Sequence, residues 1–145
     1  MPVRFSEQRE YIIAIPAFVE KDYATARTNL EALIERLRLA GETGQTAYLL
    51  HVLGNVEAEA GELEKGHSLH RKALDLAGPH PFEHLMYATG LVRSFSQPKD
   101  AIAQVEAAEE LIRSGQWTPS EEDMPREWYE SEFAKIRAEA DGHEL

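Results

Sequence analysis

The chain has 145 residues, of which 43% are hydrophobic and 28% are charged, a balance typical of one globular domain and not of a disordered protein. It contains no cysteine, which excludes disulfides, thiolate catalysis and cysteine-based zinc or iron–sulfur sites. The formal net charge of −11 argues against nucleic acid and anionic membranes as partners, because phosphate contacts need clustered lysine and arginine.

The N-terminal segment has charged residues directly before a short apolar run, which is not the layout of a secretory signal. No apolar run approaches the length that is needed to cross a bilayer. We therefore expect a cytoplasmic protein that has no membrane partner.

Helical periodicity dominates the chain, and no run of alternating β-branched residues competes with it, so the sequence predicts an all-α fold. The first helix is expected to begin at Ser6, because polar and acidic residues follow this candidate cap. Pro16 should bend this helix or end its first part, since proline has no backbone N–H. A second helix is predicted over residues 23–39, where apolar side chains recur three and four residues apart.

Two helices are then predicted within residues 47–77, separated by a turn at Gly61 and ended by the segment GPHP. A fifth helix is expected at about residues 82–95 and a sixth at about residues 99–114. After a polar, proline-bearing connection, an amphipathic helix is predicted from residue 126 to about residue 140. The pattern thus consists of three helical pairs and a final helix.

Large, small and turn-forming side chains recur within residues 47–80 at the spacing of a helix–turn–helix repeat of roughly 34 residues. They are Leu50, Leu53, Gly54, Gly61, Ala73 and Leu74. This pattern resembles the tetratricopeptide repeat family. Gly66 stands where the family usually has alanine, which still permits close helix packing.

Two flanking segments are similar to the same repeat, with departures. In residues 7–40, Ala14 replaces the family's glycine and Pro16 is foreign to the pattern. In residues 82–115, the small residues of the pattern are one position out of register.

The resemblance implies one domain formed by a right-handed superhelix of three such pairs, over about residues 7–40, 47–80 and 82–115, with a capping helix at about residues 125–140. It also implies a concave groove, lined by the first helix of each pair, in which a peptide or a partner's helix lies. The groove positions carried over to this chain are Tyr11, Tyr48, His51, Asn55, Met86 and Arg93. An alternative interpretation is that Tyr11 and Tyr48 pack between helices.

One subgroup of the family clamps the acidic C-terminal tails of chaperones with lysine, arginine and asparagine at groove positions. Only Asn55 of this chain fits that clamp, so chaperone tails are not expected as ligands.

Two histidine pairs, His67 with His70 and His80 with His84, have a spacing that metal sites use. No further ligands can be identified for either pair, so we interpret them as surface or partly packed side chains and expect no metal or other cofactor. His70 falls where the repeat places a large residue between helices. Most of the neighbouring glutamates, among them the pair Glu57 and Glu59, are interpreted as surface charges. The chain has no phosphate loop or nucleophile elbow, so no enzymatic activity is expected.

These observations favour a non-enzymatic scaffold or adaptor that binds a protein or peptide partner in the groove. A second hypothesis is an immunity or antitoxin-like inhibitor that covers a basic partner with its acidic surface. A third is a homodimer whose interface is formed by the aromatic residues near the C-terminal end in place of a capping role; these are Trp117, Trp128, Tyr129 and Phe133.

Overall fold

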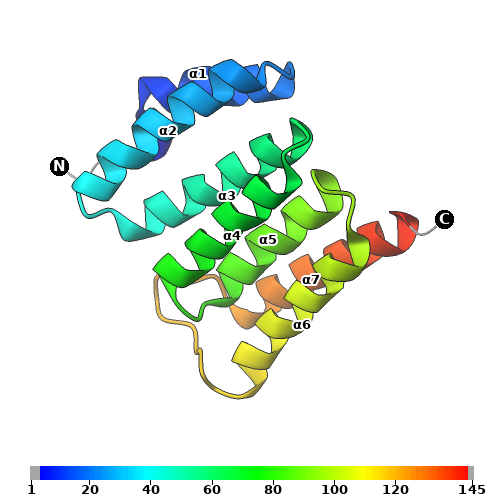
Figure 1. Cartoon of the computed structure of the whole chain (residues 1–145). Helices are drawn as coiled ribbons and strands as arrows, with labels where there is room; N and C mark the ends of the chain where they lie inside the picture. The colour runs from blue at the N-terminus through cyan, green and yellow to red at the C-terminus, as the bar shows by residue number, and fades with distance from the viewer. Residues whose placement is uncertain (1–3, 144–145) are drawn as a thin grey trace. The chain divides into compact units, whose positions relative to one another are not determined.

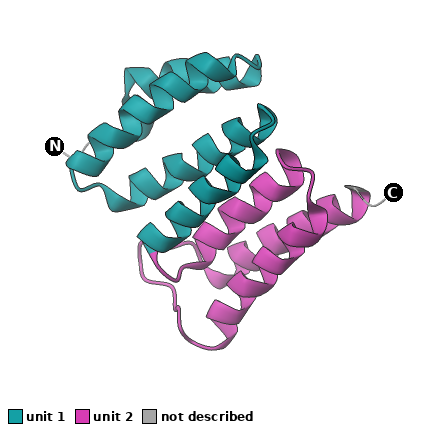
Figure 2. Ribbon diagram, viewed as in Figure 1, with its two compact units in different colours: residues 1–77 teal, residues 78–145 magenta. Residues whose placement is uncertain are grey.

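The computed structural model of the chain describes residues 4–143, in which every regular element is a helix, so the all-α prediction is confirmed (Figure 1). The elements in chain order are a 3₁₀ turn η1 (Phe5–Glu7) and the helices α1 (Arg9–Val19), α2 (Tyr23–Leu39), α3 (Thr43–Glu59), α4 (Leu63–Ala77), α5 (Pro81–Arg93), α6 (Pro98–Arg113) and α7 (Arg126–His143). They fall into two compact units, Met1–Ala77 and Gly78–Leu145 (Figure 2).

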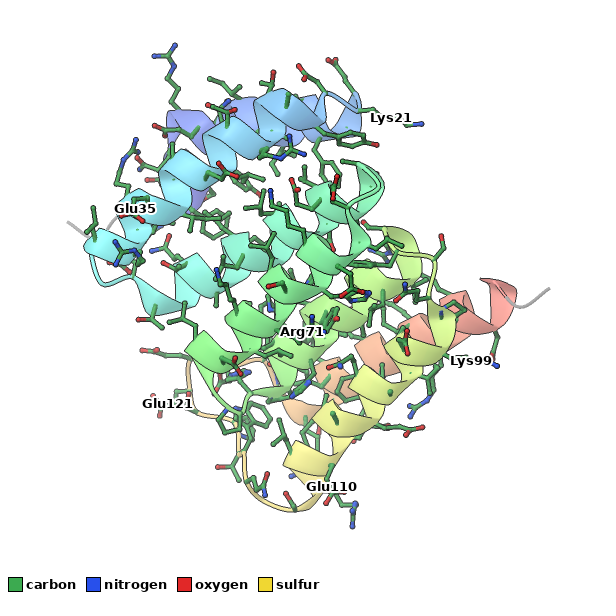
Figure 3. The ribbon with its side chains drawn as sticks, viewed as in Figure 1. Lys21, Glu35, Arg71, Lys99, Glu110 and Glu121 are labelled. Carbon is green, nitrogen blue, oxygen red and sulfur yellow. The ribbon has the colours of Figure 1, made fainter. Side chains whose placement is uncertain are left out.

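Three turns of one construction join the four α-helices of the first unit. Each turn has one residue in the left-handed backbone region: Lys21, Gly41 and Gly61, with φ of 66°, 75° and 95°. The acidic residue that follows donates its backbone N–H to a carbonyl five residues earlier, at 2.8 to 3.0 Å, which closes the preceding helix in a Schellman-type motif. Figure 3 shows Lys21 at the turn between α1 and α2, where its side chain points to solvent.

The first helix begins later than the sequence indicates. The expected cap Ser6 lies inside η1, and α1 begins at Arg9 with Gln8 as its N-cap residue. The reason is a long-range contact, because the backbone N–H of Phe5 donates to Oε1 of Gln45 on α3 at 2.6 Å. This hydrogen bond joins η1 to α3, and α1 therefore begins only after η1 ends.

Two other expectations are corrected within the first unit. Of the two effects expected of Pro16, a bend or an end of the helix, the second is wrong, because α1 continues through Pro16 to Val19 with Pro16 on its exposed side. Helix α3 begins at Thr43 and not near residue 47, because the turn before it needs only three residues. The bounds predicted for α2 are confirmed.

The core of the first unit is built from small and branched side chains of α1, α2 and α3. The stripe predicted on α2 is buried, apart from Ile34, which is partly buried. The members of this core are Ala14, Ala17, Ala26, Leu30, Leu33, Leu37, Leu49, Val52, Leu53 and Val56. Helix α1 therefore faces α2 with two alanines, which lets the two helices lie close together.

Helices α3 and α4 approach each other closely at Gly54 and Gly66. A Cβ atom at Gly54 would lie 2.9 Å from the Gly66 carbonyl oxygen and 2.7 Å from a ring carbon of His70. Both distances are shorter than van der Waals contact, so only glycine fits at position 54. The expectation that these small residues permit close packing, with His70 between the helices, is confirmed.

The second unit consists of α5, α6 and α7, and α7 packs against both other helices. Its aromatic side chains Trp117, Tyr129 and Phe133 are buried, and the rings of Trp117 and Tyr129 meet edge to face at 5.3 Å. Trp128 also meets Tyr129 edge to face, at 5.0 Å. Burial of Trp117, Tyr129 and Phe133 within the unit leaves only Trp128, which is partly buried, with surface for the dimer contact of the third hypothesis.

The close approach of α3 and α4 generates the first prediction. Gly54→Ala should lower the free energy of unfolding by about 1–3 kcal/mol, because the new methyl group overlaps a backbone carbonyl that cannot move aside alone. Urea unfolding followed by circular dichroism measures this change.

Gly44→Ala is the matched control on the same helix. Nothing lies within 4 Å of its Cβ position, so alanine should raise the free energy of unfolding by no more than about 0.5 kcal/mol through helix propensity, since Gly44 lies in the first turn of α3. Equal effects of the two substitutions would contradict the close approach at Gly54.

Candidate functional site

Three aromatic side chains from η1, α1 and α3 form a partly buried cluster, which we call the aromatic cluster: Phe5, Tyr11 and Tyr48. The ring of Phe5 stacks on that of Tyr48, with centroids 4.8 Å apart, and meets Tyr11 edge to face at 5.0 Å. Burial raises the pKa of Tyr11, and the neighbouring Tyr48 adds to this rise. The structure thus brings together two of the predicted groove residues, while both also pack between elements.

Phe5 is a member of this cluster that the sequence interpretation missed. It lies outside the periodic segment, so no helical pattern marks it. The available signal was an isolated aromatic residue shortly before a helix, which commonly packs back onto that helix.

His51, a third predicted groove residue, is fully buried between helices. Its Nδ1 lies 2.7 Å from Nδ1 of His70, and Nε2 of His70 lies 2.8 Å from Oδ1 of Asn55. A carboxamide oxygen only accepts, so this pattern assigns the proton of His70 to Nε2, which donates to Asn55. Nδ1 of His70 then accepts from Nδ1–H of His51.

These two hydrogen bonds change the interpretation of the predicted groove. His51 has no exposed surface for a partner, and the side-chain oxygen of Asn55 is already engaged by His70. Both residues serve to fasten α3 to α4. Their role was hidden in the sequence because it depends on His70, which is 19 residues from His51.

The neutral state of His70 follows from its surroundings. Burial, and after it the charges of His51 and His67, lower the pKa of His70 to about 2. The imidazole is therefore neutral at physiological pH, as the hydrogen-bond pattern requires.

The second histidine pair does not converge on a common point. Nδ1 of His80 accepts from the backbone N–H of Phe82 and caps α5, while its Nε2 lies 3.3 Å from Oδ1 of Asp123. Nδ1 of His84 lies 2.7 Å from Oε1 of Gln104. Within residues 4–143, no group of three or more potential metal ligands occurs.

Glu57 is fully buried, so its interpretation as a surface charge is wrong. Its Oε1 accepts from Nε of Arg27 on α2 at 2.5 Å, and its Oε2 lies 3.2 Å from Nζ of Lys65 on α4. One carboxylate therefore joins three helices through two cations. Because it is held in this way, Glu57 is poorly suited to acid–base chemistry.

The two predicted groove residues of the second unit differ in their surroundings. Arg93 forms a two-point ion pair with Glu139 on α7, with N–O distances of 2.6 and 3.0 Å. Met86 is partly buried on α5. The guanidinium of Arg93, which was predicted to contact a partner, is thus already paired with a carboxylate of the same unit.

A hollow of about 580 Å³ lies along α6 and α7, and we call it the acidic groove. Its lining comprises Glu106, Glu109, Glu110, Ile112, Arg113, Arg126, Glu130 and Phe133. Arg137 pairs with Glu109 at 2.5 and 2.8 Å, and Arg113 pairs with Glu110. The sequence shows the acidic residues of each helix, but only packing brings the two helices together.

No family model matches the chain, and comparisons with curated proteins and with solved structures find no match either. Among the helices of residues 4–143, none has both the length and the apolar character that a membrane span requires.

The buried histidine generates a pH prediction. The pKa of His70 in the folded state lies below the value of about 6.5 that is usual for an unfolded chain, so its contribution to stability is present above pH 6.5 and is lost as the pH falls. Between pH 7.5 and pH 5.0 this one group should lower the free energy of unfolding by about 2 kcal/mol. Urea unfolding at a series of pH values measures the slope.

His70→Gln should flatten this pH dependence, whereas His67→Gln, on the same helix and only partly buried, should leave it unchanged. The comparison uses the slope of the free energy of unfolding against pH and not its absolute value. A substitution that merely destabilises the fold at every pH therefore does not produce the same result. A slope that persists in His70→Gln and disappears in His67→Gln would refute the assignment.

Proposed function

We propose that the chain is a non-enzymatic, cytoplasmic protein-binding module of the tetratricopeptide-like type. In this proposal the pairs α1–α2, α3–α4 and α5–α6 form a right-handed superhelix and α7 caps it. Support comes from the close approach of Gly54 and Gly66 between paired helices and from the like turns at residues 21, 41 and 61. Equivalent turns of successive pairs, at 21 and 61, are 40 residues apart, so these pairs are longer than the roughly 34-residue repeat of the family. Such features suit stacked helical pairs, which bind partners through their surfaces.

The aromatic cluster is the observation that carries the binding role. Tyrosine gives a large, rigid contact area at low entropic cost together with a hydroxyl, and it is enriched at protein interfaces. Tyr11 and Tyr48 are only partly buried, so each retains surface that a partner can contact. A peptide or helix of another protein that lies across these two rings is the proposed ligand.

The contacts made by the buried polar side chains support a binding function and not a catalytic one. His70 donates to Asn55, and Glu57 is held by Arg27 and Lys65. These groups are used to hold helices together. A catalytic acid or base would instead face a cleft in which substrate can reach it.

Tyr48→Ala should weaken partner binding about tenfold or more, because it removes a central aromatic contact. A helical peptide selected from a display library on the wild-type chain serves as the probe, and fluorescence anisotropy gives its affinity. Circular dichroism of each variant shows whether the helices remain.

Tyr23→Ala is the matched control. Tyr23 is also partly buried, but it begins α2 and therefore lies at the opposite end of the α1–α2 pair from Tyr11. It should change the affinity less than twofold. Equal affinity of the wild type and Tyr48→Ala would remove the aromatic cluster from the binding surface.

The acidic groove favours a second candidate function, inhibition of a basic partner. Four glutamates and two arginines line the groove together with Ile112 and Phe133. Glu109 and Glu110 pair with Arg137 and Arg113, so the proposal relies on Glu106 and Glu130. This combination suits a partner segment with lysine or arginine beside apolar side chains, and the net charge of −11 would speed its approach.

Replacing Glu106 and Glu130 together by glutamine should weaken binding of a nona-arginine peptide about tenfold and reduce the dependence of this binding on salt. The matched control replaces Glu121 and Glu122, which lie on the connection before α7, where Figure 3 shows Glu121. Both double variants change the net charge equally. Equal loss of affinity in the two, measured by calorimetry, would show that only overall charge matters.

A further inference from the structure

The exposed side of α1 carries an apolar strip made of Ile12, Ile13, Pro16 and Val19. Ile12 is 59% exposed, Ile13 36% and Val19 76%. The opposite side of the helix is buried through Ala14 and Ala17. Helix α1 thus has apolar residues on both sides, and only one of these sides is covered within residues 4–143.

Helical geometry gathers the strip into a narrow face. At about 100° per residue, positions 9, 12, 13, 16, 19 and 20 fall within an arc of about 120° whose centre is Pro16. A helix at the edge of a stack normally turns a polar face to water. The outer face of α1 does not, and such a face marks an interaction site.

The charges at the two ends of the strip identify what covers it. Arg9 lies at the N-terminal end and Glu20 at the C-terminal end, and both are exposed. Each has the sign that its own helix dipole disfavours, because cations suit the C-terminal end and anions the N-terminal end. Beside an antiparallel helix each charge would meet the favourable end of that partner.

A second copy of α1 supplies the complementary strip. In an antiparallel pair that sets Arg9 opposite Glu20, Ile13 faces Pro16, since 9 + 20 and 13 + 16 give the same sum. A two-fold interface requires self-complementarity of this kind. Of the neighbouring charges, Glu10 is paired with Arg36, and Lys21 lies beyond the helix in the turn (Figure 3).

We infer that the chain self-associates through α1, which packs antiparallel against α1 of a second copy. The helix has 11 residues and is therefore about 16 Å long, so the contact falls below the roughly 1,200 Å² of a standard interface. The dimer is accordingly weak and reversible, with a dissociation constant of about 10–100 µM.

Sedimentation velocity at chain concentrations from about 5 to 500 µM tests the inference. The wild type should shift from monomer to dimer mass across this range, and Ile12→Glu should remain monomeric. Leu39→Glu is the matched control, because Leu39 is a 72% exposed apolar residue at the end of α2 and lies outside the strip. A wild-type chain that stays monomeric at 500 µM, or equal disruption by the two variants, would overturn the inference.

Charge reversal tests the antiparallel register. Arg9→Glu and Glu20→Arg should each weaken self-association at least fivefold, and the double variant should restore it. Both reversals improve the match to the dipole of α1 itself, so a loss of dimer cannot come from unfolding of the helix. A double variant that associates no better than the single ones would refute this register.

Discussion

The close approach of α3 to α4 at Gly54 and Gly66 is the constraint on which the rest of the first unit depends. Because no side chain separates the two backbones at this point, the ring of His70 can lie against α3 and reach both His51 and Asn55. A methyl group at position 54 would push the ring away and break the hydrogen bonds that join His70 to His51 and Asn55. An unsatisfied buried polar group costs about 1–3 kcal/mol, so one glycine protects several interactions at once.

The same helix packing explains why a charged side chain of this unit is buried. Glu57, on the same helix as Gly54, reaches Arg27 on one neighbour and Lys65 on the other. The carboxylate is buried while both cations stay partly exposed, so losing either cation would leave a buried charge less compensated, which favours this arrangement of the three helices. A partner protein would therefore contact other residues, whose side chains are exposed on the helix surfaces.

Local signals in the sequence were sufficient for much of the fold. The apolar stripe of α2 and the glycine turn before α4 depend on neighbours a few residues apart, and their positions were predicted correctly. The expected cap at Ser6 failed because a contact across 40 residues, from Phe5 to Gln45, overrides a local preference.

The candidate site was harder to derive for the same reason. The resemblance assigned Tyr11 and Tyr48 to one groove, and in the structure both rings contact Phe5, which no pattern in the sequence indicated. The burial of His51 and Glu57, and the ion pair of Arg93 with Glu139 across 46 residues, arise only when separate helices meet. A helical pattern marks which side of one helix is apolar but does not name the partner of a polar side chain.

The even spacing of the three turns limits how the first unit can change length. Removing one residue of α3 after Gly54 would rotate everything that follows by about 100° relative to Gly54, so Gly54 would no longer face Gly66. Duplicating a whole helix pair with its two turns would instead repeat the same geometry, since the left-handed residues recur every 20 positions at 21, 41 and 61. The unit is therefore suited to growth by whole modules, and gains or losses of single residues are better tolerated in the irregular connection between α6 and α7.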